Sequence, residues 1–148
     1  MSLAIDNTRK AYKAFGEGDL ATLTSLIAPD CVWHIGGRSI LTGDYVGHDQ
    51  ILGYFGKLHE LTGGTFSVRL DDLAELSATG QIVCLVTVRG TRNGITMESK
   101  MIELSRVDAQ GRVQETWWYP EDAYAGDEFF GPAEIVLPAQ KSKTAATV

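Results

Sequence analysis

IELSRVDAQGRVQETWW, residues 102–118, has the pattern of two strands joined by a turn through Gly111. Side chains alternate between the two faces of a strand, so Glu103 shares its face with Met97, Ser99, Met101 and Ser105. If the turn takes residues 108–111, Glu103 lies opposite Thr116 and Met101 lies opposite Trp118. Neither partner is a base that would neutralise the acid. The carboxyl group is therefore either well paired elsewhere or chemically useful.

Alternation of apolar and polar residues predicts four long strands, at residues 65–76, 81–91, 95–107 and 112–119. Thr79-Gly80 and Asn93-Gly94 are typical of tight turns, so consecutive strands are expected to run antiparallel. The segment 81–88 is apolar on both faces, which favours a place inside the sheet.

The N-terminal half has helical spacing instead. It predicts one helix over residues 3–15 and a second from residue 20 to Pro29, with Asp19 as the N-cap of the second. A short strand at residues 31–35 and a glycine-rich loop at residues 36–47 follow. A third helix is predicted before Gly63-Gly64 from the apolar stripe Ile51, Leu52, Phe55 and Leu58.

Three helices followed by a strand meander predict an α+β fold, in which the helices pack in a curved, mainly antiparallel sheet. A long twisted sheet wrapped round helices forms a cone-shaped α+β barrel, and its open end is a natural ligand pocket. The outer face is also apolar, because Val83 and Leu85 alternate with Ile82 and Cys84. This pattern predicts a homodimer.

The length of 148 residues and the 44% apolar content predict a single domain, over residues 1–131. The tail at residues 132–148 has too little apolar material to fold alone. Within it, Ile135, Val136 and Leu137 are expected to dock on the sheet edge or on the partner subunit, and residues after Lys141 are expected to stay mobile.

The net charge and the cysteine positions limit the kinds of partner and the kinds of cross-link that are expected. A net charge of -6 without a block of Lys or Arg argues against nucleic acid or an anionic membrane. Cys31 and Cys84 lie on different predicted strands without CxxC spacing, so free thiols are expected.

The start of the chain lacks a basic region followed by an apolar run, and no membrane span is visible, which predicts a cytoplasmic protein. The three histidines have unrelated spacings, so no metal site is expected.

The order of these elements resembles the nuclear transport factor 2-like superfamily over about residues 3–130. Three stretches are similar to its SnoaL-like polyketide cyclase and ketosteroid isomerase branch: DCVWH at residues 30–34, LTGDYVGHD at residues 41–49, and residues 106–117. The resemblance implies a cone-shaped fold and chemistry without a cofactor. It specifies the reaction poorly, because such proteins include isomerases, cyclases, hydratases, epoxide hydrolases and binding domains.

The resemblance points to one acid by two routes. Glu103 falls where SnoaL-like cyclases have their acid-base aspartate, and also on the acid that donates a hydrogen bond to the oxyanion in steroid isomerases. Thr116 stands where many of these cyclases have a histidine, and the turn is one residue longer than theirs. These departures disfavour a mechanism assisted by histidine.

Other positions depart further from the related enzymes. The general base of steroid isomerases falls on Ile35, and their oxyanion tyrosine falls on Ala11, one residue before Tyr12. Limonene epoxide hydrolases use an Arg-x-Asp pair on the strand that here contains Arg89. An Arg-x-Asp of this sheet is found instead at residues 69–71, one strand earlier. These residues are interpreted as part of an outer polar surface or a subunit contact rather than as a catalytic pair.

Glu103 is thus the candidate catalytic residue, because a buried carboxyl without a cationic partner has a raised pKa that suits general acid-base catalysis near neutral pH. The competing interpretation is a strand-end glutamate that reaches solvent or Arg106. His34 is the second candidate, although alternation places it on the outer face. The side chains expected to line the pocket are Tyr12, Trp33, Ile35, Tyr54, Met101, Thr116 and Trp118.

Two functions follow as hypotheses. The first is a cofactor-independent enzyme that uses Glu103 to shuttle a proton during isomerisation, aldol cyclisation or elimination of a small or polycyclic apolar carbonyl compound. Tyr12, Tyr45 or Tyr54 would supply an oxyanion donor. The second is a binding or assembly domain without catalysis, and an epoxide hydrolase is a further alternative.

Overall fold

The structure is a computed structural model that describes residues 2–132. Its helices are α1 (Leu3–Glu17), α2 (Leu20–Ser25), α3 (Gly47–Leu61) and α4 (Ala123–Phe130). Its strands are β1 (Ile27–Ile35), β2 (Gly43–Val46), β3 (Ser67–Glu75), β4 (Ile82–Arg92), β5 (Ile95–Val107) and β6 (Val113–Pro120). The expected docking segment at residues 135–137 lies outside the described residues.

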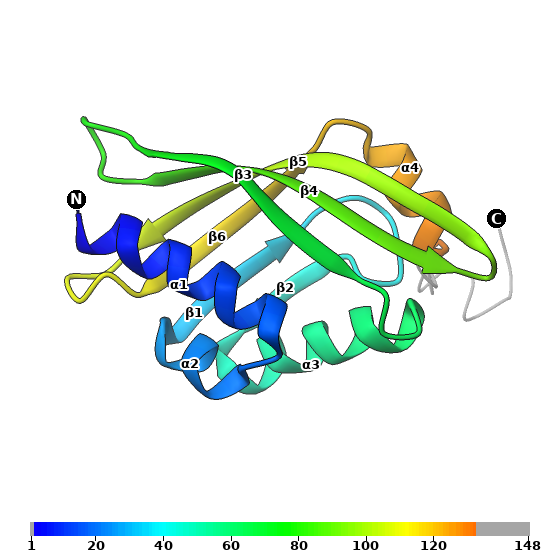
Figure 1. The fold of residues 1–148 in the computed structure, drawn as a ribbon, viewed down its shortest axis with the longest axis horizontal. Coiled ribbons are helices and arrows are strands. Elements are labelled where there is room, and N and C mark those ends of the chain that lie inside the picture. Colours follow the sequence, from blue (N-terminus) through cyan, green and yellow to red (C-terminus); the bar gives the residue numbers. More distant parts are fainter. Residues whose placement is uncertain (1, 133–148) are drawn as a thin grey trace, which may run out of the picture.

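The six described strands form one mixed sheet in the order β2-β1-β6-β5-β4-β3 (Figure 1). β1 and β6 run parallel, and the other neighbours run antiparallel. The predicted α+β class with a curved, mainly antiparallel sheet is confirmed, and β4 lies inside the sheet, between β3 and β5.

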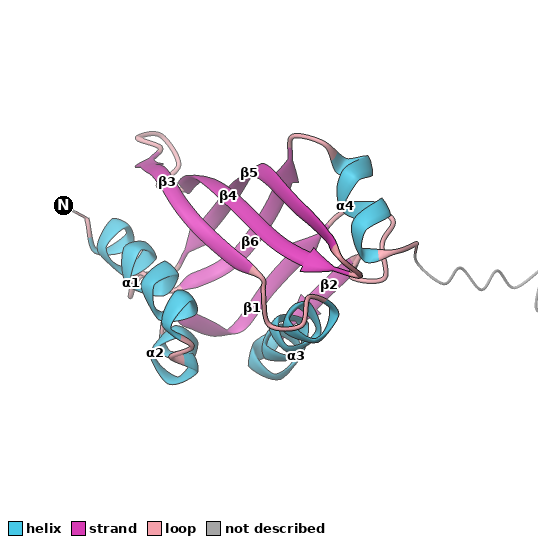
Figure 2. Ribbon diagram, turned by 45° about the vertical axis from the view of Figure 1, so that its right-hand side comes forward, coloured by secondary structure: helices cyan, strands magenta, loops and turns pink. Residues whose placement is uncertain are grey.

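The helices take two positions on this sheet. α1, α2 and α3 lie on one side of it, and α4 lies at one end, close to the end of β6 (Figure 2). Ile51, Phe55 and Leu58 of α3 are buried in the same core as Trp33 of β1. A second group of buried residues joins α1 to the inner face of β4: Ala4, Ile5, Ile82, Cys84, Val86 and Val88. No helix in the described part of the chain is long and apolar enough to cross a membrane.

The second helix and the first strand differ from the sequence prediction. α2 ends at Ser25 rather than at Pro29, and β1 begins at Ile27 rather than at Cys31. The cause is long-range, because Ile27 pairs with Val113 of β6. Pro29 lies in the part of β1 where this pairing shifts register, and a proline without an N–H is tolerated at such an irregularity.

Two elements were missing from the prediction. β2 lies inside the segment predicted as a loop, and its short sequence with Gly43 and Asp44 has a poor strand propensity, so pairing with β1 is what makes it a strand. α4 follows β6 and carries a signal that the sequence reasoning overlooked. The Asp122 side chain caps it by accepting the backbone N–H groups of Tyr124 and Ala125.

The register of the β5–β6 hairpin was predicted wrongly. Glu103 lies opposite Trp118 rather than Thr116, and Met101 lies opposite Pro120. The difference is two residues. Side chains of a strand repeat every two residues, so the set of residues on the inner face is unchanged.

Two separate one-residue shifts produce this difference. The turn is one residue longer than expected, because Val107 pairs with Val113 and not with Arg112. A β-bulge next to this pair adds the second shift, since Arg106 already pairs with Glu115. One shift alone would have turned every side chain of β6 to the other face.

α1 holds the turn of this hairpin. Asn7 Nδ2 donates hydrogen bonds to the carbonyl oxygens of Gly111, at 3.1 Å, and Gln110, at 3.4 Å. Gly111 has a φ of 74°, in the left-handed region that favours glycine. A Cβ on this residue would lie 2.9 Å from Asn7 Nδ2 and 3.0 Å from Leu3 Cγ. The turn and the first turns of α1 therefore pack too closely to admit a side chain.

We predict that Gly111→Ala destabilises the fold more than Gly80→Ala. Gly80 is the matched control, because its φ of 73° is nearly the same and a Cβ there would meet nothing within 4 Å. The left-handed conformation should cost about 1–2 kcal/mol in both variants. Displacement of Asn7 should add about 1 kcal/mol for Gly111→Ala alone. Urea unfolding measures both, and equal losses would contradict close packing of α1 on the turn.

Candidate functional site

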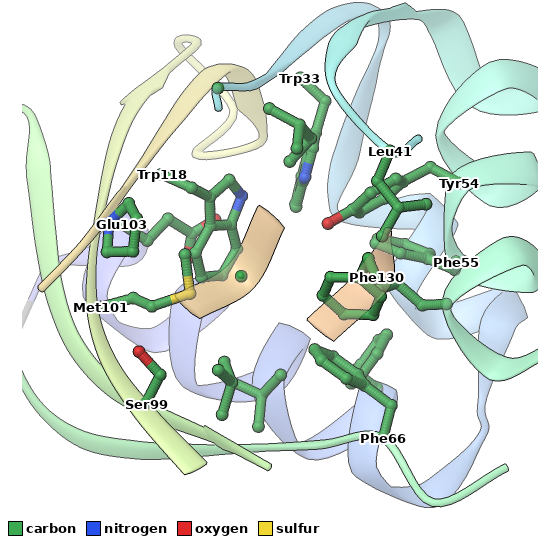
Figure 3. Close-up of a pocket in the computed structure, with 18 of the residues that line it drawn as sticks. Trp33, Leu41, Tyr54, Phe55, Phe66, Ser99, Met101, Glu103, Trp118 and Phe130 are labelled. Carbon is green, nitrogen blue, oxygen red and sulfur yellow. The ribbon is translucent and has the colours of Figure 1, made fainter. Parts of the chain in front are cut away.

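A cavity of ≈ 170 Å³ lies between the inner face of the sheet and the helices (Figure 3). Its wall is largely aromatic and aliphatic, and α1, α3, α4 and strands β1, β3, β4, β5 and β6 all contribute to it. The side chains labelled in Figure 3 are Trp33, Leu41, Tyr54, Phe55, Phe66, Ser99, Met101, Glu103, Trp118 and Phe130. The cavity is therefore an apolar site with a few polar groups, as small-molecule sites usually are.

Glu103 is the carboxyl group within this wall. Its side chain points inward from β5, beside Trp118 of β6, and the residue is only 5% exposed. The Tyr12 hydroxyl from α1 donates a hydrogen bond to Oε1. Thr116 Oγ1 donates to Oε2 at 2.9 Å. Glu103 is thus held by one helix and one strand that are far apart in the sequence.

A further hydroxyl group extends the contacts of Glu103 into a short chain. Ser105 Oγ lies 2.7 Å from Thr116 Oγ1, and both side chains are buried. Thr116 Oγ1 also lies 3.2 Å from the carbonyl oxygen of Leu104, which competes with Glu103 for the single hydroxyl proton of Thr116. The carboxyl group therefore contacts the hydroxyls of Tyr12 and Thr116 and lies at the end of a short chain of buried hydroxyl groups.

Burial raises the pKa of Glu103, while the hydrogen bonds from Tyr12 and Thr116 oppose the rise. Burial and the neighbouring Glu103 also raise the pKa of Tyr12, so its phenol keeps its proton and remains a donor at neutral pH. Among the described residues, no lysine, arginine or histidine lines the cavity. The acid is consequently stabilised by neutral donors and not by an ion pair.

The other candidate lining residues take different places. Trp33, Ile35, Tyr54, Met101 and Trp118 all line the cavity with Tyr12. Thr116 is fully buried behind Glu103 and contacts the carboxyl group without reaching the cavity wall. The hydroxyl of Tyr45 donates to the carbonyl of Leu41 at 2.7 Å, and Tyr45 lies outside the lining.

His34 lies on the outer face of the sheet, away from the cavity. Its Nδ1 is 2.7 Å from Asp44 Oδ1 and its Nε2 is 2.7 Å from Glu115 Oε2, while its ring stacks on Trp117. Two hydrogen bonds raise the pKa of His34, and the bond with Glu115 has a larger effect than the bond with Asp44. Its contacts join β2, β1 and β6 across the outer surface.

The Arg-x-Asp pair is also on the outer face. Arg69 Nε lies 2.6 Å from Asp71 Oδ1, and Thr87 donates to Asp71 Oδ2 at 2.6 Å. Neither Arg69 nor Asp71 lines the cavity. Within residues 2–132, no three His, Cys, Asp or Glu side chains lie close enough together to hold a metal ion.

Sequence reasoning missed two kinds of site residue. Phe130 reaches the cavity from α4, and the Asp122 cap was the signal that would have placed that helix. Ser105 was placed on the correct face, but its hydrogen bond to Thr116 depends on the shifted register, in which these two residues are directly opposite. No local pattern reports such a shift.

The sequence profile of the SnoaL-like domain family matches residues 8–116. An uncharacterised protein of Mycobacterium bovis, Mb0035, is 29% identical over 126 residues, which cover 85% of this chain and 95% of that protein.

Two of the similar solved structures illustrate the match. Bal32a, from a soil-derived mobile gene cassette, has a TM-score of 0.82 at 31% identity, covering 87% of this chain and 97% of its own. TerC, co-crystallised with polyporic acid, has a TM-score of 0.76 at 20% identity and covers 87% of this chain and 98% of its own, which supports the fold alone. The matching profile places the chain in the SnoaL-like domain family, and its fold is that of nuclear transport factor 2-like proteins.

Proposed function

We propose that this protein catalyses general acid-base chemistry on a small, apolar carbonyl compound bound in the cavity, with Glu103 as the group that moves the proton. One observation carries the proposal: a carboxyl group without a cationic partner lies in the wall of an apolar cavity and has a raised pKa. A base of this kind is matched to proton transfer near neutral pH.

The charges around the cavity favour a neutral ligand. The acids in the lining are Glu103, Asp122 and Asp127, and no lysine, arginine or histidine of the described chain accompanies them. Asp122 is used as the cap of α4, and Asp127 accepts the backbone N–H of Arg38 at 2.8 Å. A carboxylate or phosphate ligand would meet only like charge here. Apolar ring compounds suit the aromatic wall instead.

The chemistry begins with proton abstraction. The Glu103 carboxylate accepts a proton from the α-carbon of the ligand, and the electron pair of that C–H bond moves onto the carbonyl oxygen to give an enolate. Return of the proton to another carbon is an isomerisation, attack on a second carbonyl is an aldol cyclisation, and loss of a β-substituent is an elimination. Tyr12 and Thr116 hold the carboxyl group in place throughout.

A non-catalytic binding domain is the second candidate, and two hydrogen bonds of Glu103 favour it. Both Glu103 oxygens already accept hydrogen bonds from protein hydroxyls, as expected for a buried acid with a structural role. Small-molecule binding is common to both candidates, and TerC, a protein of this fold, was co-crystallised with a small molecule. Proton transfer separates the two.

The proposed assembly is a homodimer through the outer face of the sheet. Leu85, Ile102 and Tyr119 lie directly opposite one another on β4, β5 and β6. They are 46%, 42% and 52% exposed, and so form a continuous apolar row across three strands. Such a row is stabilised when a second subunit covers it.

The first prediction concerns proton exchange in 2-tetralone, whose benzylic α-protons are acidic and can be followed by proton NMR in heavy water. The protein should accelerate their exchange, and Glu103→Gln should lower the rate by about a hundredfold or more with affinity largely retained. Glu98→Gln is the control, because Glu98 is an exposed acid of the same strand that pairs with Arg89. Binding without exchange by the unmodified protein would identify a binding domain.

The second prediction concerns stability and pH. Because the pKa of Glu103 is raised by folding, its contribution to stability is fully present below the unfolded pKa and is lost as pH rises through the folded pKa. Glu103→Gln mimics the protonated carboxyl, so it should raise the melting temperature at about pH 8 and have little effect at about pH 4. A stabilisation that is independent of pH would show that Glu103 does not titrate in this way.

The third prediction concerns the dimer. Light scattering at micromolar concentration should give twice the mass of the chain. Ile102→Asp should give monomers, because dimerisation would bury the new charge against the second subunit, and a buried charge is costly to desolvate. Ile95→Asp, at the 67% exposed start of β5, should remain dimeric. A monomer mass for the unmodified protein would contradict the proposed interface.

A further inference from the structure

Two indole N–H groups lie in the cavity wall without an acceptor. Trp33 Nε1 and Trp118 Nε1 are both buried, and neither has a hydrogen-bond partner within residues 2–132. The two rings are neighbours, with centroids 6.0 Å apart. Figure 3 shows both indoles at the edge of the cavity. These groups are donors that the fold itself leaves unused.

Buried donors without an acceptor lower the stability of the folded protein. A buried polar group without a partner destabilises the fold by about 1–3 kcal/mol, and buried tryptophans usually direct their N–H to an acceptor. Trp33 is only 7% exposed, so the residue is part of the core and not a surface side chain with access to solvent. Two such groups side by side point to a ligand that supplies the acceptor.

The position of the pair relative to Glu103 specifies the ligand further. Trp118 lies directly opposite Glu103 in the β5–β6 pairing, and both side chains line the cavity. An oxygen bound at the Trp118 indole is therefore on the same part of the cavity wall as the carboxyl group. Indole N–H groups donate and never accept, so they select a ligand oxygen with free lone pairs. A ketone offers the indoles such an oxygen and also offers Glu103 an acidic α-carbon, because that carbon is adjacent to the one that bears the oxygen.

The volume limits the size of the ligand. An engineered apolar cavity of about 150 Å³ holds benzene. The present cavity of ≈ 170 Å³ is slightly larger, which favours a skeleton of one or two rings over a large polycyclic one.

We propose that the indole N–H groups of Trp33 and Trp118 together bind the carbonyl oxygen of a one- or two-ring apolar ketone whose α-carbon faces Glu103. The catalytic part of this inference rests on the proposed function. When the α C–H bond breaks, the proton forms an O–H bond with Glu103, and the electron pair places negative charge on the oxygen that the two indoles hold. Donors positioned where charge develops stabilise the transition state.

The binding test uses 2-tetralone and tetralin, which have the same two-ring skeleton and differ in the carbonyl. The chain has three tryptophans, so a proton–nitrogen correlation spectrum of indole-labelled protein contains three indole signals. Trp117 stacks on His34 outside the cavity and serves as the internal control. Tetralone should move the Trp33 and Trp118 signals downfield, tetralin should not, and neither should move Trp117. Equal shifts with both compounds would overturn the inference.

Variants provide a second measurement that corrects for lost packing. Trp118→Phe and Trp33→Phe should each lower the ratio of tetralone to tetralin affinity by about threefold to tenfold, the effect of one hydrogen bond. Trp117→Phe should leave the ratio unchanged. An unchanged ratio in a folded Trp118→Phe protein would contradict the inference, and the spectrum of the unmodified protein remains decisive where a variant does not fold.

The two proposals fail separately. If Glu103→Gln exchanges tetralone protons at the full rate while the ketone still moves both indole signals, the acid-base function is wrong and the indole pair remains a ligand site. If exchange depends on Glu103 but the indoles respond equally to ketone and hydrocarbon, the function stands and the inference is wrong. If neither compound binds, both are wrong.

Discussion

Burial of a carboxyl group without a cation is the constraint on which the rest of this structure depends. Glu103 is 5% exposed and is held by hydroxyls from α1 and β6. The same helix also holds the turn between β5 and β6 through Asn7 and Gly111. α1 is therefore attached to one hairpin at two points, so a change in how the helix docks also changes the environment of the acid.

The sequence was sufficient for the faces of the strands and insufficient for their register. Alternation placed Glu103, Met101 and Ser105 on one side, and the structure places them there. The partner of Glu103 was wrong because the turn length and the bulge each added one residue. Their sum is even, and an even shift preserves every face. Two one-residue irregularities therefore leave the predicted face of each side chain correct, but they change which residues are opposite one another on the two strands.

What sequence reasoning did not find depends on contacts between distant segments. Tyr12 was one of three candidate oxyanion donors and was not expected to contact Glu103, but packing of α1 against the sheet brings its hydroxyl onto that carboxyl group, across 91 residues. The strand at Ile27 likewise exists because β6 pairs with it. The cap of α4 was a local signal, so that helix, with Phe130 in the cavity, could have been predicted.

The absence of lysine, arginine and histidine from the described lining has a chemical consequence for the proposed reaction. A cation in the cavity would stabilise an enolate, but it would also lower the pKa of Glu103 and make the carboxylate a weaker base. Neutral N–H donors stabilise the developing oxyanion with a much smaller effect on the nearby acid. In the proposed reaction, the raised pKa of Glu103 and the indoles of Trp33 and Trp118 are therefore compatible: burial would set the basicity of the acid, and the indole dipoles would stabilise the negative charge.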